Sequence, residues 1–344
     1  MLPKLATLVA TFAAAVAAVA APPTNQSHIG KRDMILKPVM QGVNFPDPAI
    51  IRVGNNFFGY ATQGKVDGKR VHVQVAQSID DFEHWTYLRG RDALPKLPNW
   101  VASDNPHVWA PDVIRLDNGK YVMYYSATLK KNTNLHCVGV AFGNNPLGPF
   151  TPGNMQEQPY ICNEAAGGAI DPAGYFDPKD NTRWVVYKVD GNAVGHGGVC
   201  NNGVKPIVST PIKLQQVRTN DGVTKIGAPI QLITNGPADG PVVEAPSLSK
   251  MDDGTYVLFF SSNCFATPKY DVSYATARNI KGPYTKYGPM FVTGTMGLHA
   301  PGGLDLAING IRAVFHADYN GGRAMYTAII GGSGNKYHAY VKNR

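Results

Sequence analysis

Charged residues are scarce in this chain, and their scarcity excludes several classes of protein. Only 16% of the 344 residues are charged and 44% are hydrophobic, whereas disordered chains are poor in apolar and rich in charged side chains. The sequence lacks sustained apolar heptads, which excludes a coiled coil, and lacks glycine at every third position, which excludes collagen. What is present is a folded chain, long enough to form one large β domain.

Short motifs for several common chemistries are also missing. The chain has no phosphate-binding loop, no dinucleotide-binding glycine fingerprint and no Gly-x-Ser-x-Gly turn, so phosphoryl transfer, hydride transfer and serine hydrolysis have no support. Basic residues form no long cluster, so no nucleic acid partner is expected. The sequence has only four cysteines, without the spacing of a zinc site, and they predict one or two disulfides whose pairing stays open: Cys137, Cys162, Cys200 and Cys264.

One apolar run stands out, at the N-terminus. Residues 1–20 combine an early Lys4, an apolar stretch from Leu5 to Val19 and the small-residue ending Ala18-Val19-Ala20. This is the layout of a secretory signal peptide, and the run is short for a membrane span. We therefore expect a secreted, extracellular protein without a membrane partner.

A second processing signal follows the leader. The dibasic pair Lys31-Arg32 predicts that residues 21–32 are a pro-segment and that the mature chain is residues 33–344. Residues 1–32 hold three basic residues and no acid, so their removal lowers the formal charge from +8 to +5. So weak a basic balance gives an acidic partner little support.

Five stretches of the mature chain resemble one another. Each opens with a proline-containing element, runs a short strand into a turn such as Asn118-Gly119 or Asp253-Gly254, and returns along an aromatic-rich strand. Asn-Gly and Asp-Gly between apolar runs are strong hairpin signals. A weaker hairpin follows several of these stretches, which gives four strands per unit.

The spacing of these units predicts the fold. Their markers lie 65, 59, 73 and 58 residues apart: Asp47, Asp112, Asp171, Glu244 and Gly302. Four-stranded sheets repeated about an axis are the blades of a propeller. We predict an all-β chain, a five-bladed β-propeller of four-stranded antiparallel blades around a central channel, as a single domain over residues 33–344. A β-sandwich gives no reason for such a period.

Acidic residues beside prolines recur at the predicted innermost strands, in NFPDPA, WAPDV, AIDPA and VEAPS. Innermost strands line the channel, so Asp47, Asp112, Asp171 and Glu244 are expected to converge there. Carboxylates that share a pocket repel one another, which separates an acid from a base. Glycoside hydrolysis requires such a pair, a protonated acid for the leaving oxygen and an ionised base for water.

The four segments FPDPAIIRVGNNFFGYAT, WAPDVIRLDNGKYVMYYSA, IDPAGYFD and EAPSLSKMDDGTYVLFFSS, in this order, make the chain similar to glycoside hydrolase family 43. That family comprises five-bladed propeller enzymes that cleave α-L-arabinofuranosides and β-D-xylosides with inversion, and the resemblance covers about residues 40–330. It implies Asp47 as general base, Glu244 as general acid and Asp171 as the acid that orients and tunes Glu244. Asp112 resembles an element that mainly shapes the pocket.

Five other residues are candidates for binding the sugar. Two tryptophans offer planes for stacking, a phenylalanine precedes the expected base, an arginine resembles a family arginine near the pocket, and a histidine lies in the fifth repeat: Trp109, Trp100, Phe45, Arg323 and His316. Many family members carry a Gly-Pro-Gly-His element whose histidine meets a water or a metal ion near the channel centre. This chain has Ala300-Pro301-Gly302-Gly303 instead, without that histidine, so we expect no metal ligands and no required cofactor, and an ion in the central channel stays an open but unsupported alternative.

Together these patterns predict a secreted, monomeric inverting glycosidase that removes α-L-arabinofuranosyl residues from arabinan or arabinoxylan, with a plant cell-wall pentose polysaccharide as its partner. β-Xylosidase and endo-1,5-α-L-arabinanase activities stay open, because the sequence does not give the shape of the loops at the channel mouth. A propeller that binds glycans without cutting them is the alternative from another class.

Overall fold

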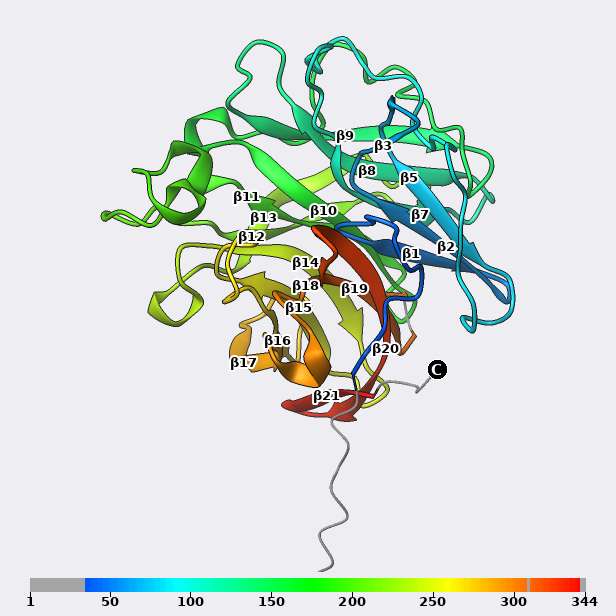
Figure 1. Cartoon of the computed structure of the whole chain (residues 1–344). Helices are drawn as coiled ribbons and strands as arrows, with labels where there is room; N and C mark the ends of the chain where they lie inside the picture. The colour runs from blue at the N-terminus through cyan, green and yellow to red at the C-terminus, as the bar shows by residue number, and fades with distance from the viewer. Residues whose placement is uncertain (1–34, 308–309, 341–344) are drawn as a thin grey trace, which may run out of the picture. The chain divides into compact units, whose positions relative to one another are not determined.

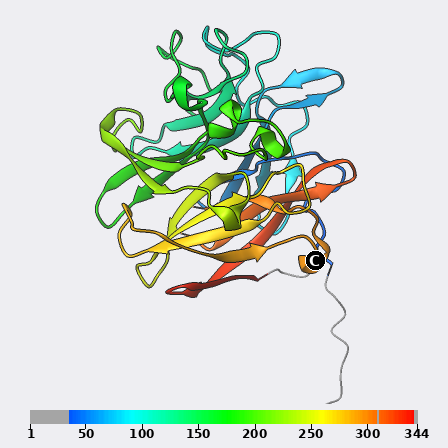
Figure 2. The same ribbon diagram turned by 90° about the vertical axis from the view of Figure 1, so that its left-hand side faces the viewer.

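Antiparallel β-strands dominate the computed structural model, which describes residues 35–307 and 310–340 (Figures 1 and 2). The predicted signal peptide and pro-segment lie outside the described residues. Within the described ranges, no helix has both the length and the apolar character that a membrane crossing requires.

The strands form five sheets in chain order, each starting at its innermost strand. The first consists of β1 (Ala49–Val53), β2 (Asn56–Ala61), β5 (Gln74–Ser78) and β6 (Thr86–Tyr87), with a separate hairpin of β3 (Gly64–Val66) and β4 (Lys69–Val71). The second consists of β7 (Trp109–Arg115), β8 (Tyr121–Thr128) and β9 (His136–Gly143). The third consists of β10 (Ala169–Asp177), β11 (Thr182–Val189), β12 (Ile212–Val217) and β13 (Lys225–Ile233).

The fourth sheet consists of β14 (Val243–Lys250), β15 (Tyr256–Ser262), β16 (Val272–Ala277) and β17 (Thr285–Phe291). The fifth consists of β18 (Gly302–Leu306), β19 (Arg312–Tyr319), β20 (Gly322–Ser333) and β21 (Lys336–Tyr340). Short 3₁₀ turns lie between strands: η1 (Glu164–Ala166), η2 (Gly191–Val194), η3 (Val199–Asn201), η4 (Pro237–Asp239) and η5 (Thr295–Gly297).

The innermost strands contact one another in a closed ring, β1 with β7, β7 with β10, β10 with β14, β14 with β18, and β18 with β1. Their labels gather at the centre of Figure 1, and the colours pass around them in chain order. This arrangement confirms the predicted five-bladed propeller. Middle strands such as β8 and β16 bury every residue, because neighbouring blades cover both of their faces.

The second blade departs from the four-strand prediction. It has three regular strands, and an isolated antiparallel bridge between Phe142 and Thr151 stands where β9 would meet a fourth. The ring is closed by the segment before β1, whose backbone N–H groups at Val39 and Phe45 donate to carbonyls of Met325 and Arg323 on the fifth blade.

A repeated backbone feature aims side chains into the channel. Five equivalent residues at the innermost strands have positive φ, between 41° and 58°: Asp47, Ala110, Asp171, Ala245 and Gly303. In four of the five blades the feature coincides with a register shift in the innermost strand, and such bulges redirect side chains. The equivalence corrects the sequence alignment of the acids: Glu244 lies one residue before this position in its blade, and Asp112 two residues after it.

Candidate active site

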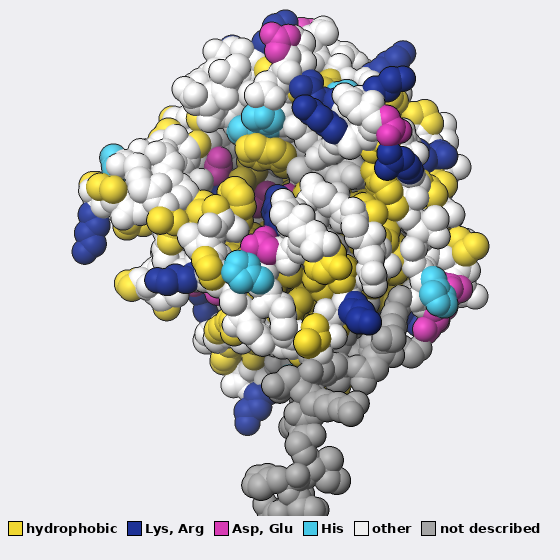
Figure 3. Space-filling view, in the orientation of Figure 1, with side chains coloured by type: hydrophobic (Ala, Val, Ile, Leu, Met, Phe, Trp, Pro, Cys, Tyr) yellow, Lys and Arg dark blue, Asp and Glu magenta, His cyan; other side chains and the backbone are white. Residues whose placement is uncertain are grey.

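A pocket of about 540 Å³ opens at one end of the channel. Its walls come from several blades and from the loops that follow their inner strands, and they include Asp47, Trp109, Asp171, Lys188, Asn192, Glu244, Phe265, Tyr270 and Arg323. On the face shown in Figure 3 the molecule is hollowed, and acidic side chains lie in the hollow. The three predicted catalytic acids all line this one pocket.

Asp47 is surrounded by donors. Arg323 Nη1 lies 2.7 Å from Asp47 Oδ1, and Thr62 donates its hydroxyl to Oδ2 at 2.6 Å. The backbone N–H of Asp47 donates to His316 Nδ1 at 3.0 Å. Burial disfavours the charged form, yet the neighbouring Arg323 and the bond from Thr62 hold the pKa of Asp47 below its usual value. The carboxylate is therefore ionised at neutral pH, as a general base must be.

Asp171 lines the same pocket, and its pKa is shifted in the opposite direction from that of Asp47. Its Oδ2 accepts the backbone N–H of Ala245 at 2.9 Å, which ties it to the residue next to Glu244. Burial, followed by repulsion from the carboxylate of Glu244, raises the pKa of Asp171 to about 7. Within one pocket the pKa of Asp171 is therefore raised while that of Asp47 is lowered. This separation is the requirement that glycoside hydrolysis sets.

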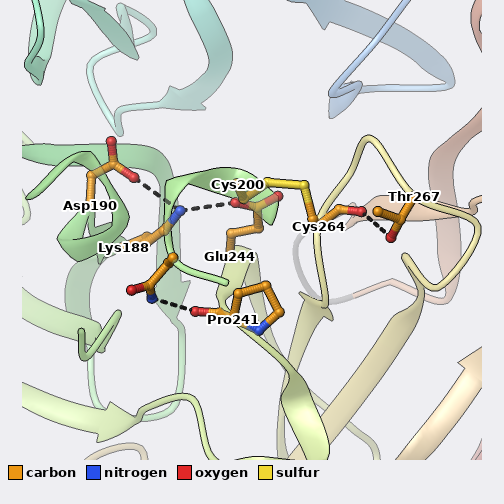
Figure 4. The surroundings of a disulfide bond; sticks show 8 residues. Lys188, Asp190, Cys200, Pro241, Glu244, Cys264 and Thr267 are labelled. Atoms are coloured by element: carbon orange, nitrogen blue, oxygen red, sulfur yellow. Dashed lines mark hydrogen bonds and ion pairs between the residues drawn. A yellow bond between two sulfur atoms is a disulfide. The ribbon is translucent and has the colours of Figure 1, made fainter. Parts of the chain in front are cut away.

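Glu244 is only 8% exposed and contacts a lysine that sequence reasoning missed. Lys188 Nζ donates to Glu244 Oε2 at 2.9 Å and forms an ion pair with Asp190 Oδ1 at 3.0 Å (Figure 4). The one signal for it in the sequence is a lysine within the apolar strand segment WVVYKV. No motif includes it, because Glu244 follows 56 residues later on the next blade.

Aromatic rings form one wall of the pocket. Trp109 stacks on His136 with ring centroids 3.8 Å apart, and His107 lies parallel to both rings. Burial lowers the pKa of His136 to about 4, so the ring behind Trp109 is neutral. Trp109 and Arg323 are thus the sugar-binding candidates that line the pocket.

Three predicted sugar contacts lie elsewhere. Phe45 has no exposed surface and packs edge-on against Tyr87. Trp100 is 5% exposed, stacks on Tyr125 and borders a separate depression. His316 has no exposed surface and contacts Asp47 instead. These placements correct the prediction, because a buried ring cannot meet a polysaccharide directly.

A cation at His316 does not fit the surrounding contacts. Its Nδ1 accepts the backbone N–H of Asp47, and its Nε2 faces the guanidinium of Arg323 at 3.5 Å. Burial, followed by the charge of Arg323, lowers the pKa of His316 to about 3. Over the described ranges, no group of three or more His, Cys, Asp or Glu side chains is arranged to hold a metal ion.

Below the pocket the channel narrows to a cavity of about 40 Å³ lined by three consecutive residues from each blade. Asp112 and Asp305 lie there. Asp112 Oδ2 accepts the backbone N–H of Gly174 at 2.6 Å, and Asp305 accepts the backbone N–H of Ile50 and the hydroxyl of Ser247. Burial raises the pKa of both carboxyl groups, that of Asp305 to about 6.

Two disulfides form, which confirms the prediction of one or two. Cys137 pairs with Cys162 within the second-blade region, and Cys200 pairs with Cys264. The second bond joins the loop after β11 to the loop after β15, and Cys200 lines the pocket close to Glu244 (Figure 4). The Cys200–Cys264 bond thus links two loops that border the pocket on the side of Glu244.

Comparison with known proteins agrees with this geometry. Residues 35–304 match the family model described as glycosyl hydrolases family 43. The protein belongs to glycosyl hydrolase family 43. Family 43 relatives include an extracellular endo-α-(1→5)-L-arabinanase of Thermotoga petrophila, 26% identical over 69% of this chain and 50% of its own. An extracellular exo-α-(1→5)-L-arabinofuranosidase of Cellvibrio japonicus is 24% identical over 70% of this chain and 66% of its own.

Solved structures share the family 43 fold. A thermostable family-43 glycoside hydrolase superposes with a TM-score of 0.71 at 21% identity, covering 90% of this chain and 97% of its own. An endo-arabinase from Bacteroides thetaiotaomicron gives 0.63 at 18% identity, covering 88% and 99%. The chain spans about half the length of the arabinanase relatives from Thermotoga petrophila and Bacillus subtilis that it matches.

Proposed function

We propose that the protein is a secreted inverting glycosidase that removes α-L-arabinofuranosyl residues from arabinan or arabinoxylan. The observation that carries this proposal is the contrast within one pocket between Asp47, whose pKa is lowered beside Arg323, and Asp171, whose pKa is raised by burial and by the neighbouring Glu244. An acid and a base held in different ionisation states on one cavity are what inverting hydrolysis uses.

Each proposed catalytic acid has one role. Asp47 takes a proton from a water molecule while the water oxygen bonds to the anomeric carbon from the face opposite the leaving group. The bond from that carbon to the glycosidic oxygen breaks, and Glu244 gives its proton to that oxygen. Asp171 accepts a hydrogen bond from the backbone N–H of Ala245 and so fixes the backbone next to Glu244. Asp47 ends protonated and Glu244 ionised, and exchange of protons with solvent restores both.

The substrate class is supported by the relatives' names and by the pocket walls. The two arabinanase relatives are named as acting within arabinan and the Cellvibrio japonicus relative as acting from an end. Trp109 supplies a ring for stacking on a furanose, and Arg323 supplies donors for hydroxyl groups. β-Xylosidase and endo-1,5-α-L-arabinanase activities are the alternatives, and all three relatives are named extracellular.

A substrate panel tests the proposal. The protein is assayed on nitrophenyl α-L-arabinofuranoside, nitrophenyl β-D-xyloside and linear arabinan, with products separated by chromatography and the anomer first released identified by NMR. We expect arabinose as the inverted anomer. Asp47→Asn and Glu244→Gln should each lower activity on arabinan by about 10³-fold or more, while the exposed Asp252→Asn serves as the matched control.

Two outcomes overturn the proposal in different ways. Variants of Asp47 and Glu244 with activity near that of the unmodified protein would show that the roles are wrong. An intact protein that binds arabinan but hydrolyses no pentoside would be a non-catalytic glycan-binding propeller.

A further inference from the structure

Lys188 has no exposed surface, although it is one of the residues that line the active-site pocket. It belongs to β11, where the neighbouring Val186 and Val189 are buried core residues. A buried ammonium group is costly unless anions compensate for the lost hydration. The burial of Lys188 therefore requires neighbouring anions that compensate for its charge.

Two carboxylates provide the compensation, one on each side of the ammonium group. Figure 4 shows Lys188 between Asp190 and Glu244, with distances of 3.0 Å to Asp190 Oδ1 and 2.9 Å to Glu244 Oε2. Burial alone would lower the pKa of Lys188, but these two carboxylates raise it above its usual value. Lys188 is therefore a cation at neutral pH.

One cation between two acids has a consequence for proton transfer. When Glu244 carries its proton, Asp190 alone balances the charge of Lys188. When Glu244 loses the proton, Lys188 is already 2.9 Å from Oε2 and no group must move to meet the new negative charge. Preorganised charge of this kind lowers a barrier because no reorganisation is needed during the reaction.

We propose that Lys188 is a positioning residue for the general acid Glu244, with Asp190 as its permanent counter-ion: Lys188 fixes Oε2 in place and stabilises the carboxylate that proton donation leaves behind. This inference rests on the proposed function. It assigns to β11 a part of the catalytic machinery that the three acids alone do not supply.

The other charged and titratable groups near Glu244 act around this pair. Repulsion from carboxylates favours retention of the proton, and cations favour its release. Besides Lys188, the groups that interact electrostatically with Glu244 or with its neighbour Asp171 are Asp47, Arg323 and Tyr270, and Asp171 and Glu244 interact with each other. Asp190 acts on Lys188 itself. Of the two cations, Lys188 is the one that directly contacts Glu244.

Two variants with opposite expected effects test the proposal through the pH dependence of kcat on arabinan. Lys188→Met removes the cation, so the acid holds its proton more tightly and the alkaline limb should move upward by about one pH unit. Asp190→Asn leaves the charge of Lys188 unshared, so the same limb should move downward. A purely structural role predicts lower activity without opposite shifts.

The leaving group provides a second readout. Lys188→Met should lower kcat by about 10²-fold on arabinan, whose leaving oxygen needs a proton, and by much less on a dinitrophenyl arabinofuranoside, which needs none. Lys188→Arg keeps the charge and should keep the alkaline limb near its original position. Circular dichroism checks folding. If Lys188→Met does not fold, the near-isosteric Asp190→Asn still decides the matter by the direction of its shift.

Failure of this inference is distinguishable from failure of the proposed function. If Glu244→Gln keeps its activity, the assignment of the acid is wrong whatever Lys188 does. If Glu244→Gln is inactive but folded variants of Lys188 and Asp190 leave the alkaline limb unmoved, the role of Lys188 alone is overturned.

Discussion

The central channel buries carboxyl groups at two depths, and their chemistry differs. At the pocket end, Asp47 contacts Arg323 and Glu244 contacts Lys188. In the narrow part below, Asp112 and Asp305 accept hydrogen bonds from backbone N–H groups and a serine hydroxyl, and within the described chain neither forms an ion pair with Lys or Arg.

The comparison separates the effect of burial from the effect of a cation. All these carboxyl groups lose hydration, which raises a carboxyl pKa. Arg323 reverses the effect at Asp47, whose pKa is lowered, whereas the pKa of Asp112 is raised well above its usual value. Cations therefore contact the acids at the pocket end, whereas the acids of the narrow channel accept hydrogen bonds from neighbouring blades.

The largest effect is expected from removing the cation beside Asp47. Without Arg323, Asp47 would be buried without an ion pair to Lys or Arg, as Asp112 and Asp305 are among the described residues. Arg323→Met removes the cation, so the pKa of Asp47 should rise and the acidic limb of the kcat/KM profile should move to higher pH. We expect activity at neutral pH to fall by about 10²-fold. Arg312→Met is the matched control, since Arg312 forms a partly exposed ion pair with Asp81. An acidic limb that does not move would refute the role given to Arg323.

A smaller effect is expected from the tryptophans. Trp109→Ala should raise KM for arabinan by about two- to tenfold, because a stacking aromatic contributes roughly 0.5–1.5 kcal/mol. Trp100→Ala should lower the melting temperature and leave KM unchanged, because Trp100 is buried against Tyr125. Equal KM values for the two variants would contradict the assignment of Trp109 to the substrate wall.

The smallest effect on activity is expected in the narrow channel. Asp305 has its pKa raised to about 6 from 3.8, so its contribution to folding stability is fully present below pH 3.8 and is lost as the pH rises through about 6. Asp305→Asn is neutral at every pH and should flatten the pH dependence of stability in that window. Urea unfolding at several pH values measures this, and activity should change little. If the free energy of unfolding changes with pH equally in Asp305→Asn and in the unmodified protein between pH 4 and 6, Asp305 is ionised in the folded protein.

Much of the fold was predictable because its signals are local. Asn-Gly and Asp-Gly turns between apolar runs indicate hairpins, and the spacing of the marker residues Asp47, Asp112, Asp171, Glu244 and Gly302 indicated five units. The missing fourth strand of the second blade was not predictable. A fourth strand would require several consecutive residues around Thr151 to pair with β9, but Thr151 forms only an isolated bridge there. How far this pairing extends depends on tertiary packing.

The site was predictable in part for the same reason. Asp47 and Asp171 occupy equivalent positions with positive φ, so the Asp-Pro pattern identified both. Asp112 also stands beside a proline but follows it, two residues after the equivalent position, and it lines the narrow cavity instead. A shift of one residue in a strand moves a side chain to the other face, so sequence patterns could not separate Trp109 from Trp100 or exclude Phe45.

By itself, then, the sequence determined the repeat, the hairpins and the three acids, since each is encoded within a few neighbouring residues. Only the tertiary structure decided which buried acids are ionised. Ionisation depends on charges a few ångströms away in space, and these come from distant parts of the chain: the guanidinium that acts on Asp47 belongs to Arg323, 276 residues further along.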